Sequence, residues 1–111
     1  MDEMQLPVDN VKFNTYICKS SVWKYPGMAG WHFIAVPGSQ SAAIKKRFGT
    51  RARGWGSLPV EVAMGSTRWH TSIFPDKKSG GYLLPLKAEV RKRERIGAGD
   101  VVSYTVRIRE P

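Results

Sequence analysis

Apolar and polar side chains alternate along much of the chain, which is the pattern of β-strands with one buried face. Together with dense apolar runs that stop at proline or glycine, this alternation predicts six strands. They cover residues 11–18, 31–36, 58–64, 67–73, 82–86 and 102–109. In the first of them Val11, Phe13 and Ile17 share one face, and we expect that face to be buried.

Two short helices are predicted between the strands. The first has Ile44 and Phe48 four residues apart on one buried edge, with Ser39 as its N-cap and Gly49 as the glycine that ends it. The second covers residues 88–95 and is heavily charged. Each half of the chain then runs strand, strand, short basic helix, strand, which suggests that the two halves are related.

A β-hairpin is the most specific of these predictions. Gly65 and Ser66 form a two-residue turn, with glycine first as a type II′ turn requires. Because such a turn fixes the register of its strands, the cross-strand neighbours follow. The core face pairs Val62 with Trp69, Val60 with Thr71 and Leu58 with Ile73. The other face pairs Ala63 with Arg68, Glu61 with His70 and Pro59 with Ser72.

Length and composition are those of one small globular domain. A chain of 111 residues, 41% of them hydrophobic, has room for a single domain, which we expect over residues 11–111 after a flexible tail at 1–10. No apolar run reaches the roughly 20 residues of a membrane-spanning helix, and the acidic start is unlike a signal peptide. We therefore expect no membrane association and a cytoplasmic location. Cys18 is a single cysteine in a predicted strand, where we expect a buried, inert thiol.

Charge is the most uneven property of the sequence. Eighteen Lys and Arg residues stand against nine Asp and Glu, a formal net charge of +9. Such an excess favours anionic partners, nucleic acid among them, and it also keeps small proteins soluble. Two basic runs fall in and around the predicted helices: Lys45, Lys46, Arg47, Arg51 and Arg53, then Lys87, Arg91, Lys92, Arg93 and Arg95. They either contact phosphates or form the solvated outer faces of the helices.

A series of motifs resembles, in order and kind, those of one uncharacterised bacterial family of small domains of unknown function. The motifs span nearly everything after residue 11: Trp23-Lys24-Tyr25-Pro26-Gly27, Gly30-Trp31-His32-Phe33, Arg51-Ala52-Arg53-Gly54-Trp55-Gly56, Thr71-Ser72-Ile73-Phe74-Pro75, Tyr82-Leu83-Leu84-Pro85-Leu86-Lys87 with Val90-Arg91, and Gly99-Asp100. The resemblance implies a mainly β fold: a double-split β-barrel with two pseudo-twofold-related halves and two short helices. It also implies distant kinship with AbrB/MazE-type swapped-hairpin domains, because residues 84–102 resemble the core of AbrB-type repressors. No activity comes with the family, and fold kinship alone does not confer DNA binding.

One face of the predicted hairpin gathers mixed ionisable groups. The register brings together Glu61, Arg68, His70 and Ser72, a set that suits either a binding surface or acid–base machinery. We favour the simpler interpretation, a solvent-facing sheet surface with a cross-strand ion pair. The chain has no zinc motif and no phosphate loop. We therefore expect no metal, no cofactor and no catalytic residue.

Two further groups have alternative roles. Lys87 and Arg91 match the family's strand-to-helix motif, and they either hold an anion or serve the structure, with Arg91 bound to buried carbonyls or to Asp100. The aromatic residues of the loop 23–31, together with Trp55, either close the barrel as part of its core, which we favour, or stack against bases or sugars.

These observations favour a non-enzymatic binding module, monomeric or weakly dimeric, with a small anionic ligand or another undetermined partner. The alternative is a nucleic-acid-binding protein of AbrB-like ancestry that uses the basic helices. An enzyme ranks third, because no nucleophile is defined. One contiguous basic face would argue for nucleic acid, and evenly spread charge would argue against it.

Overall fold

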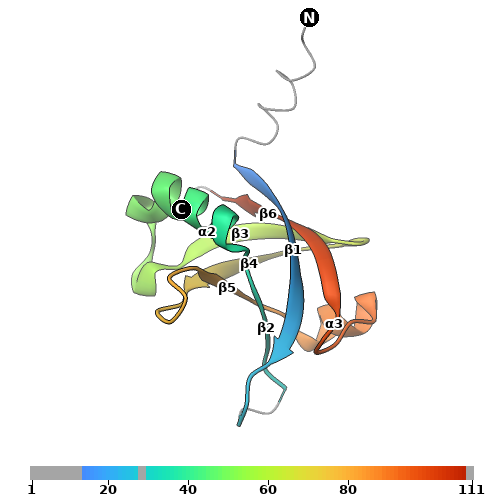
Figure 1. The fold of residues 1–111 in the computed structure, drawn as a ribbon. Helices are drawn as coiled ribbons and strands as arrows, with labels where there is room; N and C mark the ends of the chain where they lie inside the picture. Colours follow the sequence, from blue (N-terminus) through green and yellow to red (C-terminus); the bar gives the residue numbers. More distant parts are fainter. Residues whose placement is uncertain (1–13, 28–29, 110–111) are drawn as a thin grey trace, which may run out of the picture.

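The structure is a computed structural model that describes residues 14–27 and 30–109. Within them six antiparallel strands close into a barrel in the order β1-β2-β5-β4-β3-β6 (Figure 1). The strands are β1 (Thr15–Lys24), β2 (His32–Ala35), β3 (Leu58–Met64), β4 (Thr67–Pro75), β5 (Tyr82–Pro85) and β6 (Val101–Ile108). The helices are α2 (Gly38–Phe48) and α3 (Ala88–Glu94), and 3-10 turns cover Gly49–Arg51 and Gly54–Gly56. A mainly β barrel with two helices is thus confirmed, while the expected tail at 1–10 lies outside the described residues.

The barrel closes where its first and last strands meet. β1 and β6 pair over seven residues, from Thr15 opposite Arg107 to Ser21 opposite Val101. At one end of this pairing, backbone and side chain of Asn14 both bond to Ile108: the Ile108 N–H donates to the Asn14 carbonyl at 2.9 Å, and Asn14 Nδ2 donates to the Ile108 carbonyl at 2.9 Å. The two ends of the described chain therefore lie side by side.

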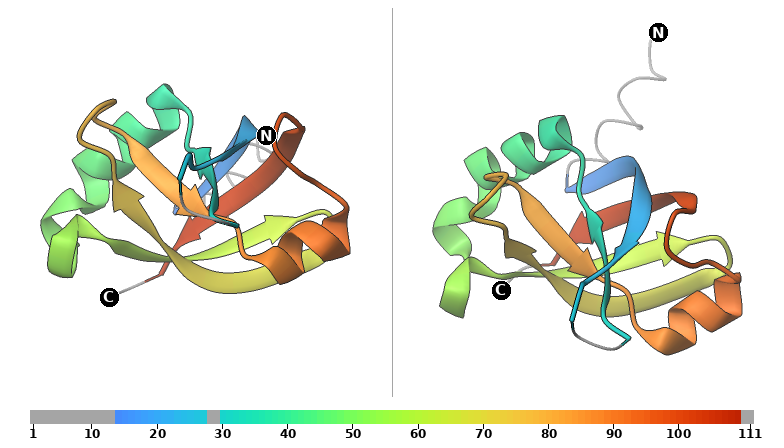
Figure 2. Two further views of the ribbon diagram at one scale, coloured as in Figure 1. Left: turned by 90° about the horizontal axis from the view of Figure 1, so that it is seen from below. Right: turned by 60° about the horizontal axis from the view of Figure 1, so that its bottom comes forward.

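The strand order of the closed barrel has an internal symmetry. If β1 is exchanged with β4, β2 with β5 and β3 with β6, every strand keeps the same two neighbours. Backbone hydrogen bonds just before the helices follow the same exchange. The Val36 N–H donates to the Tyr82 carbonyl at 2.9 Å, and the Leu86 N–H donates to the His32 carbonyl at 2.9 Å. As a result the two helices lie at opposite ends of the barrel, as Figures 1 and 2 show.

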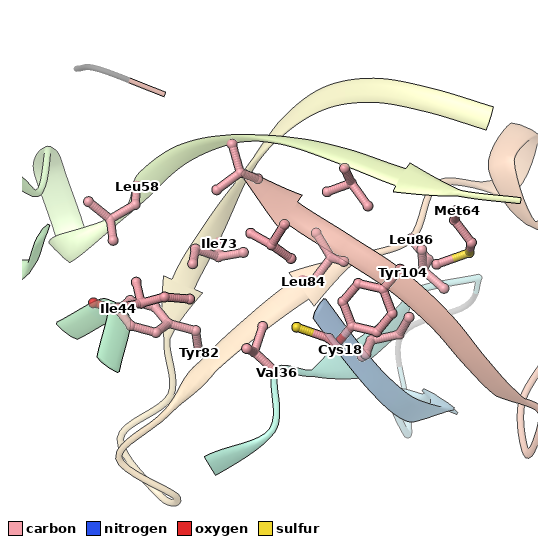
Figure 3. Close-up of a cluster of buried hydrophobic side chains, with 14 of the residues drawn as sticks. Cys18, Val36, Ile44, Leu58, Met64, Ile73, Tyr82, Leu84, Leu86 and Tyr104 are labelled. Carbon is pink, nitrogen blue, oxygen red and sulfur yellow. The ribbon is translucent and has the colours of Figure 1, made fainter. Parts of the chain in front are cut away.

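Strands β3 and β6 supply the most regular part of the core. Every second residue is buried along β3 from Leu58 to Met64, and likewise along β6 from Val102 to Ile108. Inside the barrel these side chains meet apolar groups from the other strands and from α2, among them Ile44 (Figure 3). Full burial of one aliphatic side chain contributes about 1.5–3 kcal/mol. The core therefore holds together strands that are distant in sequence.

The β3–β4 hairpin has the predicted register, pair for pair, from Leu58 opposite Ile73 to Met64 opposite Thr67. Gly65 has a φ of 59°, as the first position of a type II′ turn requires. The carboxylate of Glu94, at the end of α3, lies over this turn and accepts a hydrogen bond from the Thr67 hydroxyl. A Cβ at position 65 would meet the Glu94 carboxylate, which would have to move aside, so the turn favours glycine mainly for its backbone conformation.

The predicted buried face of the first strand is wrong. Cys18 and Val22 point into the barrel, whereas Ile17 is 57% exposed. β1 continues to Lys24, so a window that stops at Cys18 omits Val22. Together with Tyr16, which packs against the core, these residues outweigh Ile17; Val11 and Phe13 lie outside the described residues. The buried thiol itself is confirmed, and burial raises the pKa of Cys18 to about 11.

The first helix is confirmed with its buried edge, Ile44 and Phe48, but the geometry of its ends differs from the prediction. Pro37 precedes α2 with an extended backbone, so the helix begins before Ser39, whose hydroxyl makes no capping bond. The helix ends at Phe48 with Gly49 as its C-cap, as predicted, but Gly49 keeps a right-handed φ of −58° and leads into the 3-10 turn, so it is not the left-handed glycine that usually ends a helix. At 11 residues α2 is short, and among the described residues no helix is long and apolar enough to cross a membrane.

Candidate functional site

The outward side of β3, β4 and β6 carries the ionisable groups that the hairpin register predicts. Glu61 lies between His70 on β4 and Arg107 on β6. Arg107 donates to Glu61 Oε1 from Nε at 3.0 Å and from Nη2 at 2.7 Å, whereas His70 Nε2 is 3.8 Å from Oε2. These hydrogen bonds from Arg107 are the main reason why the pKa of the Glu61 carboxyl is lowered. Glu61 is therefore an ion-paired carboxylate whose main partner the sequence did not reveal.

This arrangement lacks the features of acid–base machinery. A carboxylate held by an arginine has a reduced affinity for protons, which makes Glu61 a poor general base. Within the described residues no hydrogen bond joins Ser72 to His70, so the serine has no activating base. Tyr82, on the neighbouring strand β5, is buried in the core and does not contribute to this face. Among residues 14–27 and 30–109, no three His, Cys, Asp or Glu side chains lie close enough together to hold a metal ion.

Lys87 and Arg91 lie where β5 leads into α3, and their roles differ. Arg91 Nε donates to the Leu86 carbonyl at 3.3 Å, and Nη2 donates to the Gly30 carbonyl at 3.0 Å. One guanidinium thus ties the β1–β2 hairpin to the start of α3, through one exposed and one part-buried hydrogen bond to carbonyl groups. Asp100 instead accepts a backbone N–H of its own turn at 2.8 Å. The carbonyl of Lys87 accepts the N–H groups of Val90 and Arg91, both at 3.1 Å. Its side chain is exposed and has no hydrogen bond or ion pair to another described residue.

A cleft of about 330 Å³ opens beside this arginine. Two of its lining residues, Gly30 and Leu86, are the ones whose carbonyls accept the Arg91 hydrogen bonds. The full lining is Gly30, Trp31 and His32 from the β1–β2 hairpin, and Pro85, Leu86 and Lys87 from the end of β5. Its polar groups are few: the Lys87 ammonium and the His32 ring, whose Nδ1 lies 2.9 Å from the Gly30 carbonyl oxygen. The sequence did not reveal this cleft, because its two walls are more than 50 residues apart in the chain.

Four aromatic side chains cluster on the β1–β2 hairpin. The ring centre of Phe33 lies 5.4 Å from that of Trp23, 5.9 Å from that of Trp31 and 6.2 Å from that of Tyr25. Trp31 is 54% exposed, and Trp55, on a separate turn, is 94% exposed. The prediction that these residues belong to the core is therefore wrong. Other side chains, Tyr82 and Tyr104 among them, already fill the barrel, and the β1–β2 hairpin extends beyond it, at the bottom of Figure 1.

The two basic runs lie at opposite ends of the barrel, one on α2 and the turns after it, the other on α3 (Figures 1 and 2). Within the first run, the guanidinium groups of Arg47 and Arg51 lie 5.6 Å and 5.8 Å from the ring centre of Phe48. The second run includes Glu89 and Glu94, which partly offset its charge. The two basic runs therefore lie on separate parts of the surface.

Comparison with protein families matches nearly the whole barrel. The family model described as Domain of unknown function (DUF1905) matches residues 19–106, from within β1 to within β6. None of the curated proteins compared with the chain matches it. The match brings no ligand, reaction or partner with it, so a function has to be argued from the surface of the barrel.

Proposed function

The chain belongs to the DUF1905 family of domains of unknown function, and from that premise we propose that it is a non-enzymatic binding module. Its ligand is a small molecule with a flat apolar body and a negative charge, bound in the cleft between Trp31 and Lys87. One observation carries the proposal: Lys87 lines an apolar cleft that is open to solvent, and its side chain has no partner among the described residues.

The chemistry of the lining selects this class of ligand. Trp31 offers a ring face, and Pro85 and Leu86 offer apolar surface, so a flat hydrophobic group is favoured. The Lys87 ammonium then favours an anionic substituent on that group. A volume of about 330 Å³ lies at the small end of ligand pockets, which suits a molecule of two or three rings.

Arg91 is a positioning residue in this proposal. Its guanidinium is occupied by the two carbonyls, so it is not available to the ligand in the way that Lys87 is. By joining Gly30 to Leu86 it holds the two walls of the cleft at a fixed separation. The outward face with Glu61, Arg68, His70 and Ser72 is proposed as a stabilising surface, in keeping with the pairing of Glu61 to Arg107.

We also propose the finer description of the fold. The exchange symmetry of the strand order and the matching hydrogen bonds before the two helices support a double-split barrel with pseudo-twofold-related halves. Kinship with AbrB/MazE-type domains, a bacterial origin and a cytoplasmic location are proposals that rest on the sequence alone. Shared ancestry with repressors would not by itself make this domain a DNA-binding protein.

The proposal is tested with a pair of dyes that differ in charge. Anilinonaphthalene sulfonate is flat, apolar and anionic, and N-phenyl-1-naphthylamine is its uncharged counterpart. Fluorescence titration of the native protein should show binding of both dyes, with preference for the anion. Lys87→Met should weaken the sulfonate about fivefold, which corresponds to about 1 kcal/mol for an exposed charge pair, and leave the neutral dye unchanged. Trp31→Ala should weaken both.

Lys77→Met is the matched control, since Lys77 is also an exposed lysine but lies on the β4–β5 loop, away from the cleft. It should leave both titrations unchanged. Equal effects of Lys77→Met and Lys87→Met would mean that the dye responds only to net charge. Unaltered dye binding in Trp31→Ala would place the dye elsewhere, and either result would overturn the proposal.

A further inference from the structure

Trp55 is the most exposed large hydrophobic side chain among the described residues, at 94%. Its backbone is also unusual, with φ 66° and ψ 11°, a left-handed conformation that bulky L-residues avoid. Both features oppose folding, because an indole in water gains nothing from burial and a left-handed backbone is strained. A strained backbone that persists at an exposed indole is the kind of outlier that points to contact with another molecule.

The turn that carries Trp55 is well supported. The Arg53 N–H donates to the Ser57 carbonyl at 2.9 Å, and the Gly56 N–H donates to the Arg53 carbonyl at 2.8 Å. A Cβ at Gly56 would lie 2.8 Å from Pro75 Cγ, so the turn packs closely against the end of β4. Trp55 is therefore held outward by a defined piece of structure.

The surroundings of Trp55 are basic. Residues 38–58 contain five Lys and Arg and no Asp or Glu. Lys45 and Gly56 line one cleft of about 250 Å³, which brings the last turns of α2 next to the Trp55 turn. The β4–β5 loop forms the other side of that cleft, and it carries Lys77 and Lys78 with one acid, Asp76.

We propose that this basic end of the barrel binds single-stranded nucleic acid. An unpaired base stacks on the Trp55 indole, and the neighbouring phosphates contact Lys45, Lys46 and Arg53. A single strand offers both kinds of partner, since its bases expose their ring faces and its phosphates repeat beside them. A duplex hides its ring faces within the base stack, so it should bind more weakly at this site.

A lipid surface fits the same residues less well. Membrane-binding segments present several apolar side chains together, with basic groups beside them. Within residues 49–57 Trp55 is the one large hydrophobic side chain that is exposed. One ring among cations suits stacking better than insertion. The site lies at the end of the barrel opposite the Lys87 cleft, so it stands or falls independently of the proposed function.

The test is fluorescence anisotropy with labelled dodecamers of uridylate and thymidylate, at about 50 mM and about 200 mM KCl. The native protein should bind both with micromolar affinity at the lower salt. Trp55→Asn removes the indole and keeps a residue that tolerates the left-handed backbone. It should weaken binding at least fivefold while the melting temperature stays the same or rises. The double variant Lys45→Gln/Lys46→Gln should weaken binding and reduce the salt slope by about one unit or more.

A double variant at the other end, Lys92→Gln/Arg93→Gln, removes the same charge and should leave affinity and slope nearly unchanged. Equal losses in the two double variants would mean that only net charge is sensed, which overturns the proposal. No binding at about 50 mM salt would overturn it as well. Vesicles of phosphatidylcholine and phosphatidylserine complete the test: Trp55-dependent binding to them without binding to either oligonucleotide would replace nucleic acid with a lipid surface.

Discussion

The two ends of the barrel share the same backbone arrangement but differ in their side-chain contacts. In each helix one side chain returns to a carbonyl five positions earlier: Ser41 Oγ donates to Val36 at 3.0 Å, and Arg91 Nε donates to Leu86 at 3.3 Å. The serine is buried and also accepts the Tyr82 N–H at 3.2 Å. The arginine is longer, only partly buried, and reaches across to the β1–β2 hairpin.

This difference in side-chain length accompanies a difference in how each end is covered. α2 buries Ile44 and Phe48 against the barrel, whereas α3 buries only Val90. The short Ser41 hydroxyl lets α2 lie close to the strand before it. The longer Arg91 guanidinium reaches from α3 across to the β1–β2 hairpin, and the cleft of about 330 Å³ lies beside it. A repeated backbone arrangement can thus carry more buried apolar surface on the helix at one end than on the helix at the other.

The largest expected effect concerns the end of the barrel that α2 covers. Ile44→Ala should lower the free energy of unfolding by about 3–4 kcal/mol, because Ile44 is fully buried and its cavity cannot collapse against the strands. Val90→Ala should cost about half as much, since the thinner cover of α3 can relax. Urea denaturation of both variants measures the difference. If the two costs are equal, the ends of the barrel do not differ in their contribution to stability.

The next effect concerns the turn beneath α3. Gly65→Ala should destabilise the domain by about 2 kcal/mol, because alanine is strained at positive φ and the Glu94 carboxylate must move away from the new methyl group, which disturbs its hydrogen bond from Thr67. Adding Glu94→Ala removes the contact and leaves the strain, so the double variant should be less destabilised than the sum of the singles. Thermal unfolding of the three variants forms a double-mutant cycle. Strict additivity would show that the contact with Glu94 has no energetic weight.

A smaller effect separates the two equivalent side chains. Ser41→Ala leaves the Val36 carbonyl and the Tyr82 N–H short of a buried partner and should cost about 1–2 kcal/mol. Arg91→Met should cost about 1 kcal/mol or less, because the carbonyls it releases are nearer to water. Amide hydrogen exchange at Tyr82 should speed up in the first variant and stay unchanged in the second. Faster exchange at Tyr82 in both would contradict the separate roles of the two ends.

The smallest effect is a pH dependence on the outward face of the barrel, away from both ends. The pKa of Glu61 is lower in the folded protein than in the unfolded chain, so its contribution to stability is present at neutral pH and is lost as the pH falls through the folded value. Glu61→Gln should therefore unfold less steeply with acid below about pH 4.5. Arg107→Gln should show the same flattening and His70→Gln little change, because His70 is the more distant partner.

Features that depend on residues close together in the sequence could be predicted, and features that depend on contacts between distant segments could not. The β3–β4 register followed from two turn residues, Gly65 and Ser66, because a tight turn determines every pair beyond it. The pairing of Glu61 with Arg107 did not follow, because it requires β3 and β6 to be neighbours, and nothing local encodes that. The cleft was missed for the same reason, since it exists only where two distant segments meet.

Hydrophobicity misled the prediction where function and packing diverge. Trp31 and Trp55 were assigned to the core on the general preference of indoles for burial, and both are exposed. In β1 the alternation pointed to Ile17, yet the barrel interior accepts Cys18 and Val22 from the opposite face. Both errors arise because hydrophobicity alone was used to predict burial, whereas the limited interior volume of the closed barrel decides which side chains are buried.

The hydrogen bonds between Asn14 and Ile108 have a consequence for engineering. Because entry and exit of the barrel coincide, the domain can be spliced as a cassette into a surface loop of a host protein without forcing the two halves of that loop apart. A rearranged chain, with a short linker from 109 to 14 and new termini opened in the β4–β5 loop, would retain every strand pairing of the barrel. Such a rearrangement would also leave the Lys87 cleft intact, which makes the domain a practical scaffold for displaying a small binding site.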